Sequence, residues 1–277
     1  MEIVSWNIQW GRGADGRVAL KRTAELLRRL NADVICLQEV AVDMQGLAGA
    51  EPEDGVAILR DMLPGYEAAY VAAVDISNGA GRRMCFGNLT LSRFPLGQVW
   101  RHLLPWPADP ALPAMQRACL EVVVEVPTGP IRVLNTHLEY YSERVRLAQA
   151  KRLVALAQEA EALATDPPAG KDSSPAFAPR PRPAAAVLCG DMNCEPGSIA
   201  YHALLQGGAW YDTWSLVRDG ASHAPTVGLH GAEWPDRPYC CDYFFASGVM
   251  RGAVRQIRVM EDTAASDHQP IVLELRF

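Results

Sequence analysis

The chain has 277 residues, of which 49% are hydrophobic and 21% are charged. This is the composition of a globular protein, and it excludes a wholly disordered or fibrous one. The formal net charge of −6 argues against binding to nucleic acid through the global electrostatic field, and it leaves a local basic patch open.

Simple sequence features also disfavour membrane, secreted and zinc-finger proteins. No stretch approaches the roughly 20 apolar residues that span a bilayer, so we expect no membrane anchor. The N-terminus has neither a basic start nor a long apolar core, and it predicts a strand rather than a signal peptide. The seven cysteines include no CxxC pair. We therefore expect a cytoplasmic protein with reduced thiols, and a monomer by default.

The first third of the chain predicts an α/β arrangement. A strand over 2–6, a helix over 17–30 with leucines at helical spacing, and a buried strand over 33–38 form the first unit. We then expect a short helix over 55–63 that ends at Pro64-Gly65, an extended segment over 66–74, and strands over 86–92 and 97–103.

The remainder predicts a β-hairpin, one long helix and further strands. The hairpin joins 118–126 to 131–135, and the helix covers 142–164. Segment 165–183 holds six prolines and little apolar periodicity, so we expect a flexible insertion inside a single domain over 1–277. A strand over 184–189, a helix over 198–205 and strands over 239–246, 254–260 and 270–275 follow. Many strands, few helices and no repeat favour a layered α/β protein.

Polar side chains suited to catalysis lie at the ends of these predicted strands: Asn7, Glu39, His137, Asp191, Asn193, Asp242, Asp267 and His268. Taken singly, each type is common for structural reasons, because an Asp after a strand usually caps a turn or a helix. The ends of neighbouring strands converge in space, however. The types and number together therefore predict one site.

Such a set suits phosphoryl transfer with a hard metal ion. Mg²⁺ prefers oxygen ligands and needs only one or two carboxylates. Glu39 is the best single ligand, and Asp267 and Asn7 can complete the shell directly or through water. The metal would polarise a phosphate oxygen and neutralise developing charge.

The other residues suit water activation and charge stabilisation. Asp191 is placed to take the proton of an attacking water, and Asn193 to donate hydrogen bonds to that water or to the phosphate. An Asp242–His268 pair would fix and charge an imidazole aimed at the phosphate.

An ordered set of motifs along the chain resembles the endonuclease/exonuclease/phosphatase superfamily, which includes deoxyribonuclease I-like enzymes and a branch of bacterial metal-dependent hydrolases. The motifs are Trp6-Asn7-Ile8, Gln38-Glu39-Val40, the segment 87–95, Asn135-Thr136-His137-Leu138, Gly190-Asp191-Met192-Asn193, Asp242-Tyr243 and Ser266-Asp267-His268-Gln269-Pro270. The resemblance implies a four-layered α/β sandwich, with two packed mixed β-sheets flanked by helices. It also implies a Mg²⁺- or Mn²⁺-dependent phosphoesterase.

The resemblance also implies residue roles. Glu39 would be the metal ligand, with Asn7 and Asp267 near the metal, and His137 would contact the phosphate. Asp191 or the histidine of the Asp242–His268 pair would be the general base, and Asn193 would support the water. The Asn-Thr-His-Leu segment looks more like the tyrosyl-DNA phosphodiesterase, sphingomyelinase and bacterial hydrolase branches than like abasic-site endonucleases.

Substrate-binding residues are marked less clearly. Arg82 and Arg83 lie in a basic, glycine-rich segment before the motif that holds Asn88, and that segment suits a phosphate contact and a solvated hairpin tip equally. Arg117 opens a strand and suits either the anionic site or a salt bridge. His230 lies in a predicted loop near the site. Trp234, with Trp210, Tyr211 and Trp214, favours packing over an aromatic wall for a base or head group.

These observations leave several functions open. The leading one is hydrolysis of a phosphodiester or phosphomonoester by in-line attack of an activated water. The alternatives are a nuclease or DNA-end-processing phosphodiesterase, a non-catalytic module that binds a phosphate ligand, and a thiol protein that uses Cys240-Cys241. The negative net charge argues mildly against nucleic acid, and a small phosphodiester, a phosphorylated metabolite or a lipid head group fits at least as well.

Overall fold

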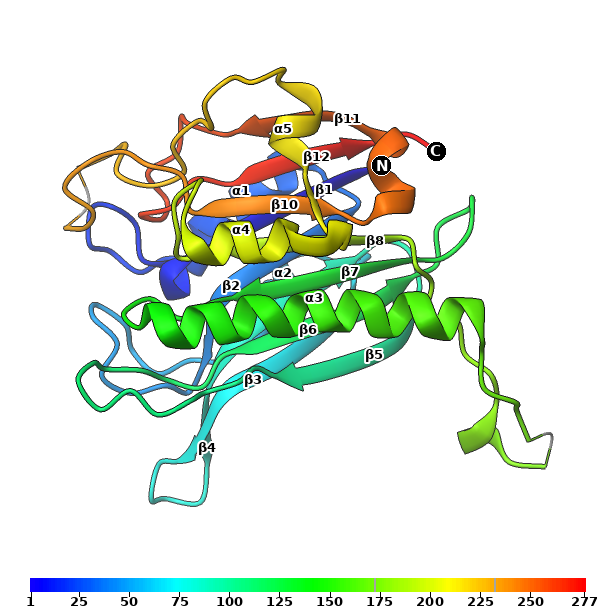
Figure 1. The fold of residues 1–277 in the computed structure, drawn as a ribbon. Coiled ribbons are helices and arrows are strands. Elements are labelled where there is room, and N and C mark those ends of the chain that lie inside the picture. Colours follow the sequence, from blue (N-terminus) through cyan, green and yellow to red (C-terminus); the bar gives the residue numbers. More distant parts are fainter. Residues whose placement is uncertain (172, 232) are drawn as a thin grey trace.

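Two six-stranded β-sheets pack face to face at the centre of the molecule (Figure 1). The structure is a computed structural model, and it describes residues 1–171, 173–231 and 233–277. One cluster of buried hydrophobic side chains fills the space between the sheets. A second cluster lies between the first sheet and its helices, and a third lies between the second sheet and its helices. The predicted four-layered α/β sandwich is therefore confirmed.

The first sheet has the strand order β11-β12-β1-β2-β4-β3. Its strands are β1 (Glu2–Asn7), β2 (Val34–Val42), β3 (Glu67–Ser77), β4 (Arg83–Ser92), β11 (Val254–Val259) and β12 (Ile271–Leu275). Only the β1–β2 pair among them is parallel. This pair lies in the middle of the sheet. Because the two strands are parallel, β1 and β2 end on the same edge of the sheet.

The second sheet has the order β5-β6-β7-β8-β10-β9. Its strands are β5 (Leu96–Leu103), β6 (Ala118–Val124), β7 (Ile131–His137), β8 (Ala186–Asp191), β9 (Tyr211–Asp212) and β10 (Asp242–Ala246). Among these pairs β7–β8 alone is parallel, and it is again central. The predicted β-hairpin is present as the antiparallel β6–β7 pair.

Helices cover the outer faces of both sheets. The apolar sides of α1 (Leu20–Leu30) and α2 (Gly55–Met62) pack on the first sheet. The apolar sides of α3 (Glu143–Thr165) and α4 (Ile199–Leu205) pack on the second sheet. The short α5 (Thr213–Val217) lies near β11 (Figure 1). Ser142 and Ser198 cap α3 and α4 through backbone N–H groups. No helix within the described ranges has the length and apolar character needed to cross a membrane.

The structure departs from the predicted elements in several places, and β2 continues to Val42 instead of ending at residue 38. α1 begins at Leu20 rather than Arg17, because hydrogen bonds from Gly13 N–H to Arg17 O and from Ala19 N–H to Gly11 O hold the preceding residues in a loop. β9 and α5 were not expected from the sequence, since both are too short to show a period. The β3–β4 hairpin is longer than predicted, so Arg83 lies in a strand.

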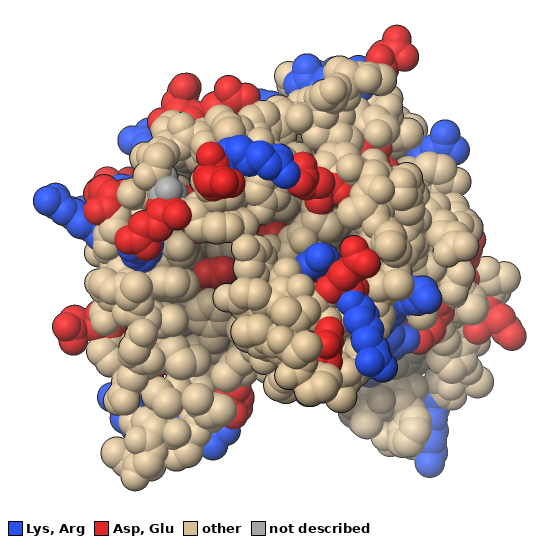
Figure 2. All heavy atoms as spheres, turned by 60° about the vertical axis from the view of Figure 1, so that its left-hand side comes forward, with Lys and Arg blue, Asp and Glu red and all other residues tan. Residues whose placement is uncertain are grey.

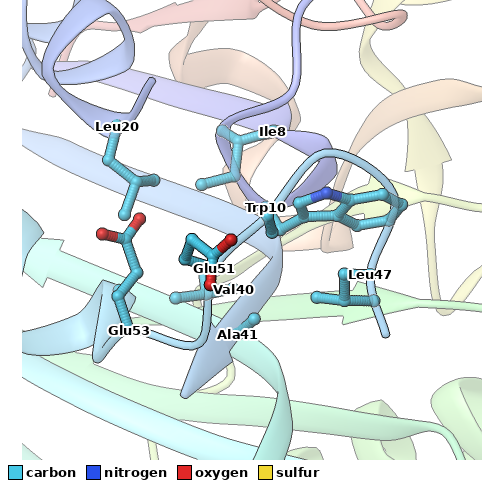
Figure 3. A pocket seen from close by; sticks show the side chains of 10 residues that line it. Ile8, Trp10, Leu20, Val40, Ala41, Leu47, Glu51 and Glu53 are labelled. Atoms are coloured by element: carbon cyan, nitrogen blue, oxygen red, sulfur yellow. The ribbon is translucent and has the colours of Figure 1, made fainter. Parts of the chain in front are cut away.

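A small cavity lies where the 43–54 loop packs against the Gln9–Gly11 turn (Figure 3). Its volume is about 20 Å³, which is room for about one water. Trp10 and Leu47 lie side by side at its edge, and the carboxylates of Glu51 and Glu53 approach the apolar lining. The cavity is too small for a substrate and serves the packing of the loop that follows β2.

The proline-rich segment 165–183 projects from the body of the fold (Figure 1). Asp172 lies outside the described residues, and the described stretches 166–171 and 173–183 contain one 3₁₀ turn, Pro175–Phe177. The last part of the segment is attached to the second sheet, because Arg182 donates hydrogen bonds of 2.9 Å to both carboxylate oxygens of Glu121.

Glu121 of β6 is the centre of a buried ionic network. Its carboxylate lies 3.2 Å from the Arg132 guanidinium and 2.8 Å from His102 Nε2, and Arg182 completes the set. Burial alone would raise the pKa of Glu121, but the hydrogen bonds from His102 and Arg182 and the charge of Arg132 lower it to about 2. The network thus stabilises the fold fully above the normal glutamate pKa of 4.5, and this contribution is lost progressively as the pH falls from there through about 2.

We expect Glu121→Gln to lower the free energy of unfolding by about 3–5 kcal/mol, because Arg132 would remain buried without its counter-charge. Urea unfolding at neutral pH measures this loss. Glu195→Gln is the matched control, since Glu195 pairs with Arg237 at the exposed surface and should change stability by less than about 1 kcal/mol. Equal effects of the two changes would contradict the buried network.

Candidate active site

The polar residues predicted from strand ends come together at one end of the sandwich. They surround a pocket of about 400 Å³ lined by Glu39, Arg117, His137, Tyr140, Tyr141, Asp191, Asn193, Trp234, Asp267 and His268. Figure 2 faces this end and shows a hollow with acidic atoms at its floor. Asn7 and Asp242 lie directly behind the lining and contact it.

The topology explains this convergence. The central parallel pair of the first sheet carries Asn7 and Glu39 at or near the ends of β1 and β2. The parallel pair of the second sheet places His137 of β7 opposite Asp191 of β8. Because both pairs end on the same side of the sandwich, four strands deliver side chains to one pocket.

Glu39 occupies a strained position in β2. Its φ of 58° is in the left-handed region, and the pairing of β2 with β4 shifts register between Leu37 and Val40. Such a bulge turns a side chain away from the regular alternation of a strand. Asn193, after β8, has a φ of 49°. Strained non-glycine residues cost of order 1–3 kcal/mol each and cluster at functional sites.

Gly190 allows β7 and β8 to approach each other next to the site. Its φ is +137°, and a Cβ there would lie 1.8 Å from the carbonyl oxygen of Thr136. Only glycine fits this position. The close approach keeps His137 and Asp191 in register as neighbours.

Asp191 is the centre of the site. Its Oδ1 accepts a hydrogen bond of 2.8 Å from the Asn193 N–H, and its Oδ2 accepts one of 3.1 Å from Asn7 Nδ2. The same Oδ2 lies 3.4 Å from His137 Nε2 and 3.6 Å from His268 Nε2. The carboxylate is therefore oriented from several sides and lines the pocket.

The two histidines are in opposite charge states. Burial and the charge of Arg117 lower the pKa of His137 to about 3, so its imidazole is neutral. Asn193 Nδ2 lies 2.9 Å from His137 Nε2 and also donates to Leu138 O, which makes that ring nitrogen the acceptor. Burial also opposes the charged form of His268, but Asp242 and Asp191 outweigh it and raise the pKa of His268 well above its normal value.

Asp242 fixes the His268 imidazole. Its Oδ2 lies 2.9 Å from His268 Nδ1 and accepts a second hydrogen bond of 2.6 Å from Thr226 Oγ1. The predicted Asp–His pair is therefore present in the geometry, and its imidazolium faces Asp191 through Nε2.

Glu39 and Asp267 offer carboxylates on the other side of the pocket. Burial, followed by the negative charge of Asp267, raises the pKa of Glu39 to about 7. Gln9 Nε2 donates a 2.8 Å hydrogen bond to Asp267 Oδ2, and its buried Oε1 has no partner among the described residues. Two close carboxylates and an unpartnered buried oxygen fit a hard divalent cation.

Asn7 contributes differently from a direct ligand. Its Nδ2 lies 3.1 Å from both Glu39 Oε1 and Asp191 Oδ2, while its Oδ1 accepts from the Gln9 N–H. This orientation favours a positioning role, in which Asn7 holds two carboxylates beside each other. Gln9 was not singled out from the sequence, because only the fold brings it to Asp267, 258 positions away.

The arginine and asparagine predicted to bind substrate both lie at the site, where they line a small side cavity together with Glu39 and His137. Arg117 lines the pocket, is 7% exposed, and has an Nε without a hydrogen-bond partner among the described residues. Its Nε lies 3.6 Å from Glu139 Oε2. Asn88 is buried, and its Nδ2 donates a 3.0 Å hydrogen bond to Ala118 O of the opposite sheet. Arg117 thus suits anion binding, whereas Asn88 joins the sheets.

Arg82, Arg83 and His230, the weaker candidates for substrate binding, are not among the residues that line the pocket. Arg82 and Arg83, at the end of the β3–β4 hairpin, pair with Asp43 and with Asp75 at 2.5 and 2.7 Å. His230 is exposed and hydrogen-bonded to Glu261 O at 2.6 Å. Each side chain is held by a nearby surface acceptor, and sequence alone gave no sign of those partners.

An aromatic rim borders the pocket and consists of Tyr140, Tyr141 and Trp234. The Tyr140 ring lies edge-on to Tyr141 at 4.7 Å and to Trp234 at 5.2 Å. Tyr141 is 55% exposed. The tyrosine pair was missed from the sequence, although two adjacent aromatic residues just after the His137 motif are a usable signal. Trp210 and Trp214 are buried, as the packing interpretation predicts.

The model of the Endonuclease/Exonuclease/phosphatase family matches residues 4–268. The chain belongs to this family. Among solved structures, an endonuclease/exonuclease/phosphatase from Beutenbergia cavernae is similar at 25% identity and a TM-score of 0.68, over 100% of this chain and 71% of that one. No curated protein matches the sequence.

Two more distant structures share the fold of this family member. A mannosyl-6-phosphatase from Bacteroides thetaiotaomicron is 16% identical with a TM-score of 0.69, and the match covers 100% of both chains. The 3′ phosphatase NExo from Neisseria, bound to a product DNA hairpin, is 20% identical with a TM-score of 0.66, again over 100% of both chains.

We expect the apparent affinity for Mg²⁺ to rise with pH up to about 7 and then to level off, because a proton on Glu39 competes with the metal below its pKa of about 7. The dissociation constant should be roughly 30-fold weaker at pH 5.5 than at pH 8. Calorimetric titration measures it, with the exposed Glu53→Gln variant as control. Equal dissociation constants at both pH values would refute Glu39 as the metal ligand.

Proposed function

We propose that this protein is a divalent-metal-dependent phosphoesterase, which hydrolyses a phosphodiester or phosphomonoester by in-line attack of water. The observation that carries the proposal is the arrangement around Asp191. This carboxylate lies between a neutral His137 and a cationic His268, next to the Glu39 and Asp267 carboxylates.

Glu39 and Asp267 would hold the metal, Mg²⁺ or Mn²⁺, with Asn7 and Gln9 orienting their carboxylates. When bound, the ion would neutralise negative charge on the phosphate oxygens. The family membership supports a phosphoester substrate in general.

Asp191 is the proposed general base. Hydrogen bonds from Asn7 and the Asn193 N–H fix its carboxylate and leave it facing the pocket. His268 suits the role less well, because Asp242 and Asp191 favour its protonated form, which has no free lone pair to accept a proton. The charge state of His268 thus supports Asp191 as the base, a choice that the sequence leaves open.

The remaining groups suit binding and stabilisation of the phosphate. The His268 imidazolium, fixed by Asp242, would face the charge that develops on the phosphate oxygens. Arg117 adds a second buried cation to the pocket lining. His137, held by Asn193, can donate through its other ring nitrogen, which lies 3.8 Å from Glu39 Oε1.

The aromatic rim favours a leaving group with a flat or ring-shaped face. Tyr140, Tyr141 and Trp234 offer ring surface beside the proposed phosphate site. A sugar and an unpaired nucleobase both present such a face. A nuclease or end-processing activity on single-stranded nucleic acid is therefore the second candidate, and the negative net charge makes a small substrate the first.

Glu39→Gln and Asp191→Asn should each lower kcat on bis-p-nitrophenyl phosphate by roughly 10²–10⁴-fold, because one removes a metal ligand and the other the base. Steady-state kinetics with Mg²⁺ or Mn²⁺, and with EDTA, measures the effect. Arg82→Ala and His230→Ala are controls and should keep normal rates, since neither side chain lines the pocket.

If the metal-loaded protein hydrolyses no member of a panel of sugar phosphates, nucleotides, DNA, RNA and phosphodiesters, the enzyme proposal fails. Tight phosphate binding without turnover would then favour the non-catalytic module.

Trp234→Ala and Tyr141→Ala should raise KM about 10-fold for a nucleotide or sugar-phosphate substrate, as expected for loss of one stacking surface. Binding of inorganic phosphate should stay unchanged, because the rings do not supply the charges that hold it. Phe177→Ala, which removes an exposed aromatic ring from the proline-rich segment, is the matched control. Unchanged KM values across such substrates would exclude the rim from substrate binding.

A further inference from the structure

A buried cysteine thiol, that of Cys241, lies beside Asp191 and His268 and has no part in the proposed hydrolysis. Cys241 directly precedes β10, and its carbonyl accepts a hydrogen bond of 2.8 Å from the Met192 N–H, next to Asp191. Ligand atoms from Asp191, Cys241 and His268 all lie within 4.8 Å of one another. All three residues are buried, and Asp191 and His268 also line the pocket.

This combination of donors differs from the oxygen set around Glu39. Thiolate, imidazole and carboxylate together are the ligands of Zn²⁺ and of other thiophilic ions, whereas Mg²⁺ and Mn²⁺ select oxygen. Three protein ligands next to an open pocket leave a fourth position for water. The chain thus holds a soft-metal donor set beside a hard-metal donor set.

Two further observations at the cluster point to a cation. Asp242 Oδ2 lies 2.9 Å from His268 Nδ1, and a carboxylate on the second ring nitrogen is the usual support of a metal-binding histidine. Asp242 Oδ1 is buried without a hydrogen-bond partner among the described residues, and Cys241 Sγ lies 3.5 Å from the other oxygen of that carboxylate. The carboxylate beside the Cys241 thiol therefore has one buried oxygen, Asp242 Oδ1, without a hydrogen-bond donor among the described residues.

We propose that Asp191, Cys241 and His268 form a second metal site, which binds Zn²⁺ or a similar thiophilic divalent ion and thereby inhibits the enzyme. Binding forms one bond from the metal to the Cys241 sulfur and one to a His268 ring nitrogen, and it releases the thiol proton and the imidazolium proton to solvent, with no change in oxidation state. Inhibition follows because the ion occupies Asp191 and His268. Metal binding stands independently of the proposed function, whereas the inhibition rests on it.

The binding test uses the full-length protein and cadmium or cobalt chloride. Wild type should bind one equivalent with a thiolate-to-metal charge-transfer band, and Zn²⁺ should remove that band by competition. Cys241→Ser and Cys241→Ala should abolish it, and His268→Gln should weaken cadmium binding by about 10-fold or more. Cys85→Ser, which changes a more exposed free thiol, should keep it.

The activity test measures inhibition by Zn²⁺ in the presence of excess Mg²⁺. The concentration for half-inhibition should rise about 10-fold or more in Cys241→Ser relative to wild type and to Cys85→Ser. No charge-transfer band in wild type, or a band that persists without Cys241, overturns the site. If the Cys241 variants do not fold, an unaltered cadmium affinity in His268→Gln overturns it instead. A normal band in a protein that hydrolyses no phosphoester would sink the proposed function alone.

Discussion

Hydrogen bonds from side-chain amides join the two sheets where their hydrophobic interface gives way to the polar site. Asn135 of β7 donates to Leu37 O and Leu89 O of the opposite sheet at 3.1 and 3.0 Å, and Gln38 Nε2 donates to Asn135 Oδ1 at 2.7 Å. These directional bonds set the position of β2 against β7 in a way that apolar contacts alone do not. They place Glu39 next to His137, and the geometry of the pocket depends on that alignment.

The site concentrates features that oppose folding. Glu39 and Asn193 have left-handed backbone conformations, and Glu39 lies close enough to Asp267 for the two charges to repel. The buried network around Glu121 lies elsewhere in the second sheet and contributes stability of the opposite sign. A cation held between Glu39 and Asp267 would relieve the repulsion, which is why metal binding and the protonation of Glu39 should be coupled.

The proposed catalytic groups and the aromatic rim come from different parts of the chain. The proposed reacting groups lie on or next to the central strands, which hold them in fixed positions. The aromatic rim comes from connecting segments after β7 and before β10, where sequence can vary without disturbing the sheets. The proposed second metal site also depends on the segment before β10, because Cys241 directly precedes that strand and lies next to Asp191 and His268.

The sequence by itself determined the layered architecture, the family and the residues at the strand ends, because alternating apolar patterns and short motifs are local properties. Asp191 and His268 were identifiable in this way. The tertiary structure alone decided which side chains meet: it paired Arg82 and Arg83 with surface carboxylates, turned the Asn7 amide toward two carboxylates, and added Gln9, Tyr140 and Cys241 to the site. Those contacts join residues far apart in the chain, and only the packing and register of the two sheets fix them.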